Sequence, residues 1–300
     1  MAQAWPAKPV RVIVQFPAGG AADTILRVIA APLAQALGQP VVVENRPGAD
    51  GAIAGEAVAK APPDGYTLFM ATSSAIAAVP AMRKSPPYDP LTAFTPIGKV
   101  GTFSYFAFTH PSVPAKTMPE LIDYIRANPG KLNYAGATTT GIMAAAQLAA
   151  AAKLDMVRVP YKGEGPASVD LISGRVQLMF GTPTNTLGSA KEGKLRVLAT
   201  LLDKRSAVLP DVPTMLESGA PKLSVVPWAA FVGPAKLPAD IVSRVNRELN
   251  GILARPEVRE QIERQVFEIQ PSTPEELGVY LREQVDAWKN AVRDSGLPLE

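Results

Sequence analysis

Apolar and polar positions follow two alternating patterns along most of the chain. Short runs rich in Val, Ile, Leu and Phe alternate with stretches in which apolar residues recur every three or four positions. The first pattern indicates buried strands, and the second indicates amphipathic helices. Strands are predicted at residues 11–16, 41–44, 66–70, 104–108, 132–135, 157–160, 176–180, 195–201 and 225–232. Helices are predicted at residues 21–37, 53–60, 118–127, 167–173, 239–254 and 273–293, with a further alanine-rich helix that ends at residue 152.

This order of elements predicts an α/β fold. Strands that alternate with helices form parallel sheets whose faces the helices cover. A chain of 300 residues is long enough for one large or two medium domains. Extended runs around Tyr105 and Val226 indicate two crossings between domains. We therefore expect one lobe made of residues 5–103 and 229–300, and a second lobe made of residues 104–228.

Composition and charge argue against several classes of function. The net charge is only +3, and Lys and Arg do not run together, so we expect no nucleic-acid binding. The chain has no cysteine and one histidine, His110, which argues against a thiolate or histidine metal site and a histidine-activated nucleophile. The G-x-S-x-G pattern is absent. We expect neither a metal, nor a cofactor, nor an enzymatic activity.

The first residues fit a processed secretory protein. Ala2-Gln3-Ala4 has the small-residue pattern that precedes a signal-peptidase cut, but no basic or apolar region stands before it. The simplest interpretation is a chain whose signal peptide has been removed and replaced by Met1. An ordinary alanine-rich cytoplasmic start is the alternative.

Five predicted loops follow the carboxyl ends of predicted strands, where open α/β sheets bind their ligands. They lie at residues 17–24, 71–75, 136–141, 161–167 and 181–186 and are rich in Gly, Ala, Ser and Thr. Small residues let a ligand approach the backbone amides, and helix N-termini add free donors and about half a unit of positive charge. The loops therefore predict a site for an anion, which phosphate or carboxylate would suit equally.

Several side chains in these loops have two interpretations. Asp23 and residues 138–140 either cap the helices that follow or contact the ligand. The same choice between a structural and a ligand role is open for Ser73. Lys162 is expected to be a solvated or structural charge, and Glu164 is expected to be exposed.

The chain also resembles a known family over essentially its whole length. The matching segments are residues 8–14, 16–20 with Asp23, 41–49, 63–68, 129–135, 159–163, 193–199 and 209–214, in the family's order. They are similar to the Bug proteins, the TctC-type solute receptors of tripartite tricarboxylate transporters. Each motif is modest by itself, but the ordered set is specific.

The resemblance implies a periplasmic receptor with the two-lobed type II periplasmic binding protein fold and a ligand cleft between the lobes. It implies that a small-molecule carboxylate binds there, held by backbone amides, hydroxyls and waters, and passes to membrane transporter subunits. We expect a monomer. The expected ligand-binding residues are Phe16, Ala18, Gly19, Gly20, Ala21, Asp23, Thr72, Ser73, Ala137, Thr138, Thr139, Thr140, Tyr161, Gly181 and Thr182.

Two positions depart from the family pattern. Relatives often carry an acidic or amide residue where Gly181 stands, and a histidine close to the position of Met143. Both changes remove polarity and add room, so we expect a pocket for a less polar tail, such as a longer aliphatic or an aromatic acid. Two other functions stay open, namely a ligand-loaded co-receptor for a membrane sensor and an enzyme on the same fold.

Overall fold

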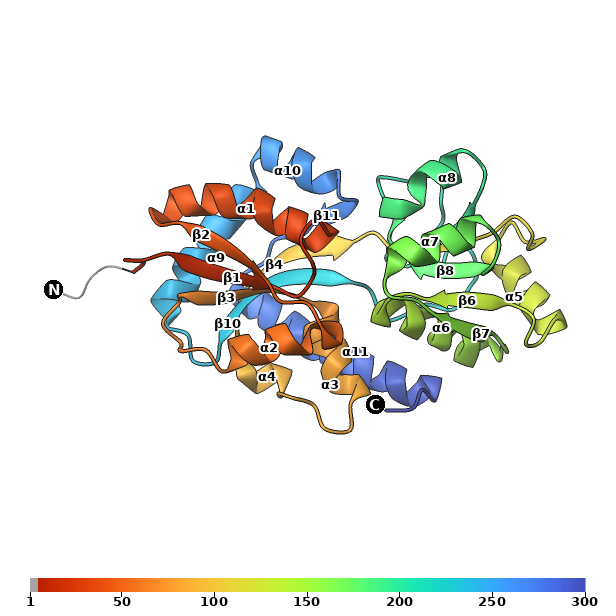
Figure 1. Ribbon diagram of the computed structural model, residues 1–300, viewed down its shortest axis with the longest axis horizontal. Helices are drawn as coiled ribbons and strands as arrows, with labels where there is room; N and C mark the ends of the chain where they lie inside the picture. Colours follow the sequence, from red (N-terminus) through yellow and green to blue (C-terminus); the bar gives the residue numbers. More distant parts are fainter. Residues whose placement is uncertain (1–4, 300) are drawn as a thin grey trace. The chain divides into compact units, whose positions relative to one another are not determined.

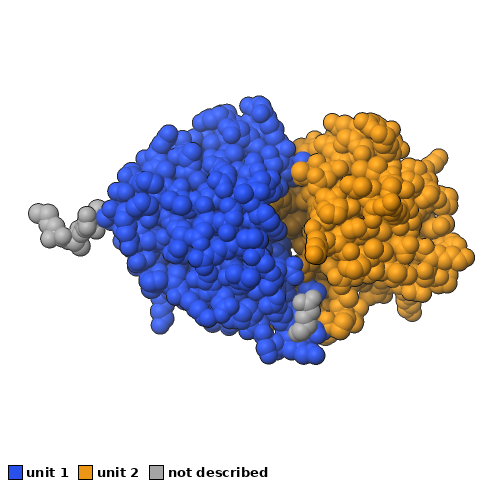
Figure 2. Space-filling model, in the orientation of Figure 1, with its two compact units in different colours: residues 1–102, 228–286, 299–300 blue, residues 103–227, 287–298 orange. Residues whose placement is uncertain are grey.

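The computed structural model describes residues 5–299, so the Ala2-Gln3-Ala4 segment lies outside the described part of the chain. The chain divides into two compact units, which Figure 2 shows in different colours. Unit 1 contains the chain up to Thr102, the segment Trp228–Asp286, and Leu299. Unit 2 contains Phe103–Pro227 and Ala287–Pro298, so the last turns of the C-terminal helix group with unit 2.

Unit 1 is built on a six-stranded sheet with the order β11–β4–β10–β3–β1–β2 (Figure 1). Its strands are β1 (Val10–Val14), β2 (Val41–Asn45), β3 (Thr67–Thr72), β4 (Phe94–Phe103), β10 (Trp228–Pro234) and β11 (Phe267–Ile269). β1, β2 and β3 pair in parallel, whereas β10 is antiparallel to both β3 and β4. The expectation of parallel pairing therefore holds for β1, β2 and β3 but is wrong for β10. The chain enters β10 directly from unit 2, without the helical crossover that makes neighbouring strands parallel.

Helices cover both faces of this sheet because its central strands are apolar on both sides. They are α1 (Ala21–Leu37), α2 (Ala52–Ala59), α3 (Val79–Met82), α4 (Pro90–Ala93), α9 (Ala239–Leu253), α10 (Pro256–Glu263) and α11 (Pro274–Ser295). α1 buries Ile25, Ile29 and Leu33, which share one helix face at a spacing of four, and it packs against α9. On the other face, α2 and α11 enclose a core around Phe69 and Trp228.

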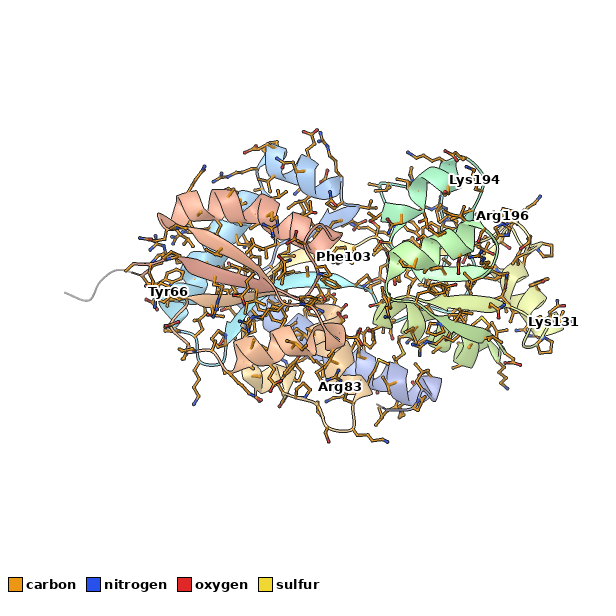
Figure 3. The ribbon with its side chains drawn as sticks, in the orientation of Figure 1. Tyr66, Arg83, Phe103, Lys131, Lys194 and Arg196 are labelled. Atoms are coloured by element: carbon orange, nitrogen blue, oxygen red, sulfur yellow. The ribbon has the colours of Figure 1, made fainter. Side chains whose placement is uncertain are left out.

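Unit 2 is built on a five-stranded sheet with the order β7–β6–β8–β5–β9 (Figure 1). The elements are β5 (Phe106–Thr109), α5 (Met118–Ala127), β6 (Asn133–Gly136), α6 (Thr139–Ala152), β7 (Val157–Pro160), α7 (Glu164–Ile172), β8 (Leu178–Gly181), α8 (Leu187–Lys191) and β9 (Arg196–Thr200). β6 pairs in parallel with β7 and β8, and β5 is antiparallel to β8 and β9. This sheet is also mixed. Arg196, labelled in Figure 3, fixes the loop after β5 by donating to the carbonyls of Val113 and Ala115.

Most of the predicted elements are present, and α1, α5 and β7 begin and end at the predicted residues. The sequence analysis missed β4, α10 and β11, as well as the short helices α3, α4 and α8. β4 lacks a clear strand pattern because it contains Pro96, Gly98 and Gly101, residue types that weaken a strand. Pairing with β10 along its length holds it in the sheet.

Candidate functional site

The predicted loops gather at the carboxyl ends of parallel strands, separately in each unit. In unit 1, the parallel pairing of β1 and β3 brings residues 17–24 and 71–75 to one edge of the sheet. In unit 2, the parallel pairing of β6 with β7 and β8 does the same for residues 136–141, 161–167 and 181–186. Each unit therefore carries its own group of small-residue loops.

Asp23 organises the turn between β1 and α1. It is 1% exposed, and its carboxylate accepts hydrogen bonds from the Gly19 amide at 2.9 Å, Arg27 Nε at 2.9 Å and Asn45 Nδ2 at 2.7 Å. Burial acts to raise the pKa of Asp23, but the three donors outweigh burial, and the pKa is lowered. Gly19 has a φ of 83°, which glycine adopts without strain. Both carboxylate oxygens thus have donors within unit 1.

The first turn of α1 presents backbone amides next to this carboxylate. The N-cap is Gly20, which has no side chain to cap the helix, and its own amide donates to the Pro17 carbonyl at 3.3 Å. The amides of the first helical turn, beginning with Ala21, have no acceptor within an α-helix. The helix dipole makes this end positive. Phe16 and Ala18 are exposed beside it, so an anion can reach the turn.

Gln15 holds the second loop of unit 1 in place. It directly follows β1 and is 3% exposed. Its side-chain nitrogen donates to Ser74 Oγ at 2.7 Å and to the Asp50 carbonyl at 3.1 Å, and its oxygen accepts from the Thr72 amide at 3.3 Å. A π-helical turn, Ser74–Ala78, begins there and continues into α3. Such turns are frequent at functional sites.

Thr138 and Tyr105 form the corresponding turn of unit 2. Thr138 is the N-cap of α6, and its hydroxyl accepts from the Gly141 amide at 3.1 Å. The hydroxyl of Tyr105 lies 2.7 Å from Thr138 Oγ1. Position 141 must be glycine, because a Cβ there would lie 2.6 Å from the Phe180 carbonyl oxygen. Thr138 therefore caps the helix, while the next two amides lie in the first turn without an intrahelical acceptor.

Glu164 folds over Thr182 in unit 2. Its carboxylate oxygens lie 3.1 and 3.2 Å from the Thr182 amide nitrogen, and the Thr182 hydroxyl also donates to it. Burial raises the pKa of Glu164, although hydrogen bonds from Thr182 and Tyr105 oppose the shift. The expectation that Glu164 is exposed is wrong. α7 begins at Glu164 rather than at residue 167, and its first turn packs against the end of β8.

Tyr161 is also engaged within unit 2. Its hydroxyl donates to Asp170 Oδ2 at 2.8 Å. Burial, together with the hydrogen bond to Asp170, raises the pKa of Tyr161 to about 12. Its hydroxyl proton is therefore used within unit 2.

The structure places the expected ligand-binding residues in two groups. Unit 1 carries Phe16, Ala18, Gly19, Gly20, Ala21, Asp23, Thr72 and Ser73, and unit 2 carries Ala137, Thr138, Thr139, Thr140, Tyr161, Gly181 and Thr182. The sequence analysis did not single out Gln15, Asn45 or Tyr105. Gln15 and Asn45 are polar residues that close apolar strands, which is the signal that could have found them. No local pattern marks Tyr105.

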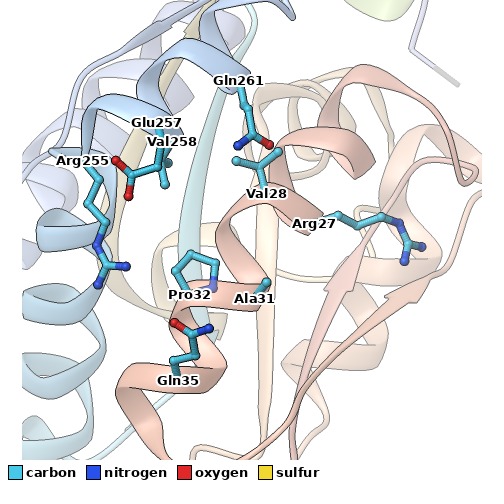
Figure 4. Close-up of a pocket in the computed structure, with 9 residues that line it drawn as sticks. All are labelled: Arg27, Val28, Ala31, Pro32, Gln35, Arg255, Glu257, Val258 and Gln261. Carbon is cyan, nitrogen blue, oxygen red and sulfur yellow. The ribbon is translucent and has the colours of Figure 1, made fainter.

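A separate groove lies in unit 1 between α1 and α10 (Figure 4). It has a volume of about 500 Å³ and is lined by apolar and charged side chains, among them Pro32, Arg27 and Arg255. None of the expected ligand-binding residues, all of which the structure describes, lines it. Arg27 links the groove to the first loop through its ion pair with Asp23. We therefore place the candidate site at the loops and not in this groove.

The fold and its loops define an α/β protein of the periplasmic binding protein class, and solved structures of that class match it closely. The model of the TctC family, described as the tripartite tricarboxylate transporter family receptor, matches residues 25–297. The chain belongs to this family, whose members are solute-binding receptors. Within residues 5–299, no helix combines the length and apolar character needed to cross a membrane.

Related proteins extend this assignment. The chain is 36% identical to protein BugT of Bordetella pertussis over 304 residues, which cover 100% of this chain and 93% of BugT. It is similar to Rpa4515 of R. palustris, solved with adipate, with a TM-score of 0.86 at 29% identity, covering 98% of this chain and 99% of that one. It is also similar to MatC (Rpa3494) from Rhodopseudomonas palustris with bound malate, with a TM-score of 0.83 at 30% identity, covering 96% of this chain and 100% of that one.

Proposed function

We propose that this protein is a monomeric periplasmic receptor that binds a small carboxylate and passes it unchanged to the membrane subunits of a tripartite tricarboxylate transporter. Family membership supports the proposal, as do the relatives solved with adipate and with malate. The observation that carries it is the first turn of α1, where uncapped amides lie beside a turn fixed by Asp23.

In this proposal, the first-turn amides of α1 bind one ligand carboxylate. The positive end of the helix and several aligned donors offset the loss of hydration of the anion. The Thr138 turn gives unit 2 first-turn amides of the same kind, which can bind a carboxylate directly or through ordered water.

The substitution Ala21→Pro removes one amide donor and leaves the helix intact. Ala21 is the first helical residue of α1, a position where proline is favoured. Gly20 before it is extended, with φ −72° and ψ 161°, as a residue before proline prefers. Losing a hydrogen bond to a charged group removes about 1.5–3 kcal/mol. We therefore expect the affinity for malate or adipate, measured by isothermal titration calorimetry, to fall by roughly 10–100-fold.

Ala239→Pro is the matched control. Ala239 is the first residue of α9 and follows an extended Pro238, so the same amide is lost on a helix that carries none of the expected site residues. Its affinity for malate and adipate should equal that of the wild type. The proposal is wrong if Ala21→Pro binds as tightly as Ala239→Pro, or if the neutral diamide of adipate binds the wild type as tightly as adipate does.

A further inference from the structure

The carboxylate of Glu164 lies in the unit 2 loops without a cationic partner. Glu164 is the first residue of α7 and is half-buried as a whole, and the hydrogen-bond donors to its carboxylate in this loop are the amide and the hydroxyl of Thr182. No ion pair among residues 5–299 includes Glu164. A carboxylate taken partly out of water without a cation is held at an energetic disadvantage.

Glu164 belongs to the same hydrogen-bonded cluster as the Thr138 turn. The Tyr105 hydroxyl lies 2.7 Å from Thr138 Oγ1, and it also acts to lower the pKa of the Glu164 carboxyl. Thr138 in turn caps α6 through the Gly141 amide. The carboxylate of Glu164 and the Thr138 turn therefore belong to the same group of loops in unit 2.

Gly181 makes room for this carboxylate. A Cβ at position 181 would lie 3.2 Å from Glu164 Oε1 and 3.1 Å from Met179 Cε. An acidic group from α7 therefore lies directly beside Gly181, which argues against the expected loss of polarity there. Met143 is fully buried in α6.

The Thr182 donors are also withdrawn from any anionic ligand. Both its amide and its hydroxyl are used by Glu164, so this part of unit 2 presents a negatively charged acceptor. A ligand carboxylate placed there would bring two like charges together in a half-buried position, which is unfavourable. A ligand hydroxyl or ammonium group would instead donate to Glu164, and hydrogen bonds to charged groups are the stronger ones.

We propose that Glu164 determines the specificity of the receptor, selecting carboxylates that carry a hydroxyl or ammonium donor over plain dicarboxylates of the same length. This inference rests on the proposed function, because it concerns which of the carboxylates that the receptor binds are favoured by the loops of unit 2. In both cases Glu164 requires a hydrogen-bond donor on the carbon chain of the ligand. The experiment distinguishes whether this donor is a hydroxyl or an ammonium group.

Matched probes test the requirement for a donor. Succinate, malate and aspartate share one four-carbon dicarboxylate skeleton and differ by H, OH or NH₃⁺ at one carbon, and adipate with 2-aminoadipate repeats the comparison at six carbons. In calorimetric titrations at pH 7.5, we expect the wild type to bind at least one donor-bearing probe tenfold or more tightly than its plain counterpart. Which of malate and aspartate gains affinity identifies the donor.

The ratio of the affinity for a donor-bearing probe to the affinity for its plain counterpart should fall at least tenfold in Glu164→Gln for the ammonium probes. For malate it should fall by a smaller factor, since an amide oxygen still accepts from a hydroxyl. A purely structural role for Glu164 would lower all affinities together and leave the ratio unchanged. Glu192→Gln is the control, since Glu192 is exposed and pairs only with Lys194 among the described side chains. Thermal unfolding of each variant verifies that it is folded.

The outcomes separate this inference from the proposed function. Plain dicarboxylates that bind the wild type as tightly as the donor-bearing probes would overturn the role of Glu164 and leave carboxylate binding intact. The role of Glu164 would also be overturned if Glu164→Gln and Glu192→Gln changed the ratio of affinities equally. If none of the five probes binds the wild type, the proposed function fails, and this inference fails with it.

Discussion

Replacing Asp23 by Asn tests whether a buried carboxylate holds the first ligand turn in place. The substitution keeps the shape of the side chain but removes its charge and one of its two acceptor oxygens. In the folded protein the carboxylate accepts from the Gly19 amide, Arg27 and Asn45. An amide group has only one acceptor oxygen and presents its NH₂ group to the remaining donors, so at least one donor loses its acceptor.

The expected loss of stability follows from these contacts. A hydrogen bond to a charged group contributes about 1.5–3 kcal/mol. The ion pair with Arg27 adds less than about 1 kcal/mol, because that side chain is 52% exposed. We expect the free energy of unfolding of unit 1 to fall by about 2–4 kcal/mol. For a domain of this size, each kcal/mol lowers Tm by about 2–4 °C.

The dependence on pH gives this prediction a signature. The pKa of Asp23 is lowered from its usual 3.8 in the folded protein. The stabilisation is therefore complete above pH 3.8 and is lost as the pH falls through the lowered folded pKa. The wild type and Asp23→Asn should differ most near pH 7 and should converge in strong acid.

Urea unfolding followed by circular dichroism at pH 7 and pH 3 measures the difference, and titration with malate measures its effect on binding. The control is Asp123→Asn, because Asp123 is 75% exposed on α5 and, among residues 5–299, forms an ion pair with Arg126 alone. It should change the stability by less than about 0.5 kcal/mol. The reasoning is refuted if Asp23→Asn matches this control at pH 7, or if its loss of stability is the same at both pH values.

Three further predictions follow from the contacts of buried groups. Gln15→Leu should destabilise unit 1 by about 2–4 kcal/mol, because it leaves the Thr72 amide and the Ser74 hydroxyl without the hydrogen bonds that Gln15 provides. Gln35→Leu, on the exposed side of α1, is the control and should be nearly neutral in the same unfolding assay. Gly141→Ala should lower the free energy of unfolding by about 1–3 kcal/mol and weaken malate binding, because the new Cβ would collide with the Phe180 carbonyl oxygen. Gly188→Ala in α8 is the control, because a Cβ at that position meets nothing within 4 Å. Burial lowers the pKa of Lys99 from 10.5 to about 8, although Glu268 opposes the shift. Between these pH values the unfolded chain binds more protons than the folded protein, so the contribution of Lys99 to stability should rise from pH 8 to pH 10.5. Urea unfolding of Lys99→Met at pH 8 and pH 10.5 should lack this contribution and show only the change caused by the other titrating groups.

The sequence by itself determined the local features of this protein. The apolar positions Ile25, Ile29 and Leu33 recur at the helical period, so α1 could be placed to the residue. Thr117 marked the start of α5 because a threonine hydroxyl can cap a helix, and in the structure it accepts from the Glu120 amide. Such features depend on neighbours in the chain, and the pattern of residues records them directly.

The tertiary structure decided which distant groups meet. The antiparallel direction of β10 depends on where the chain returns to the sheet, which no local pattern encodes. The contacts of Gln15 with Ser74 and of Glu164 with Thr182 join loops that only strand order brings to one edge. A polar residue in a loop can be solvated or buried against a partner with the same local sequence around it. Its role is therefore fixed by the sheet that carries the partner.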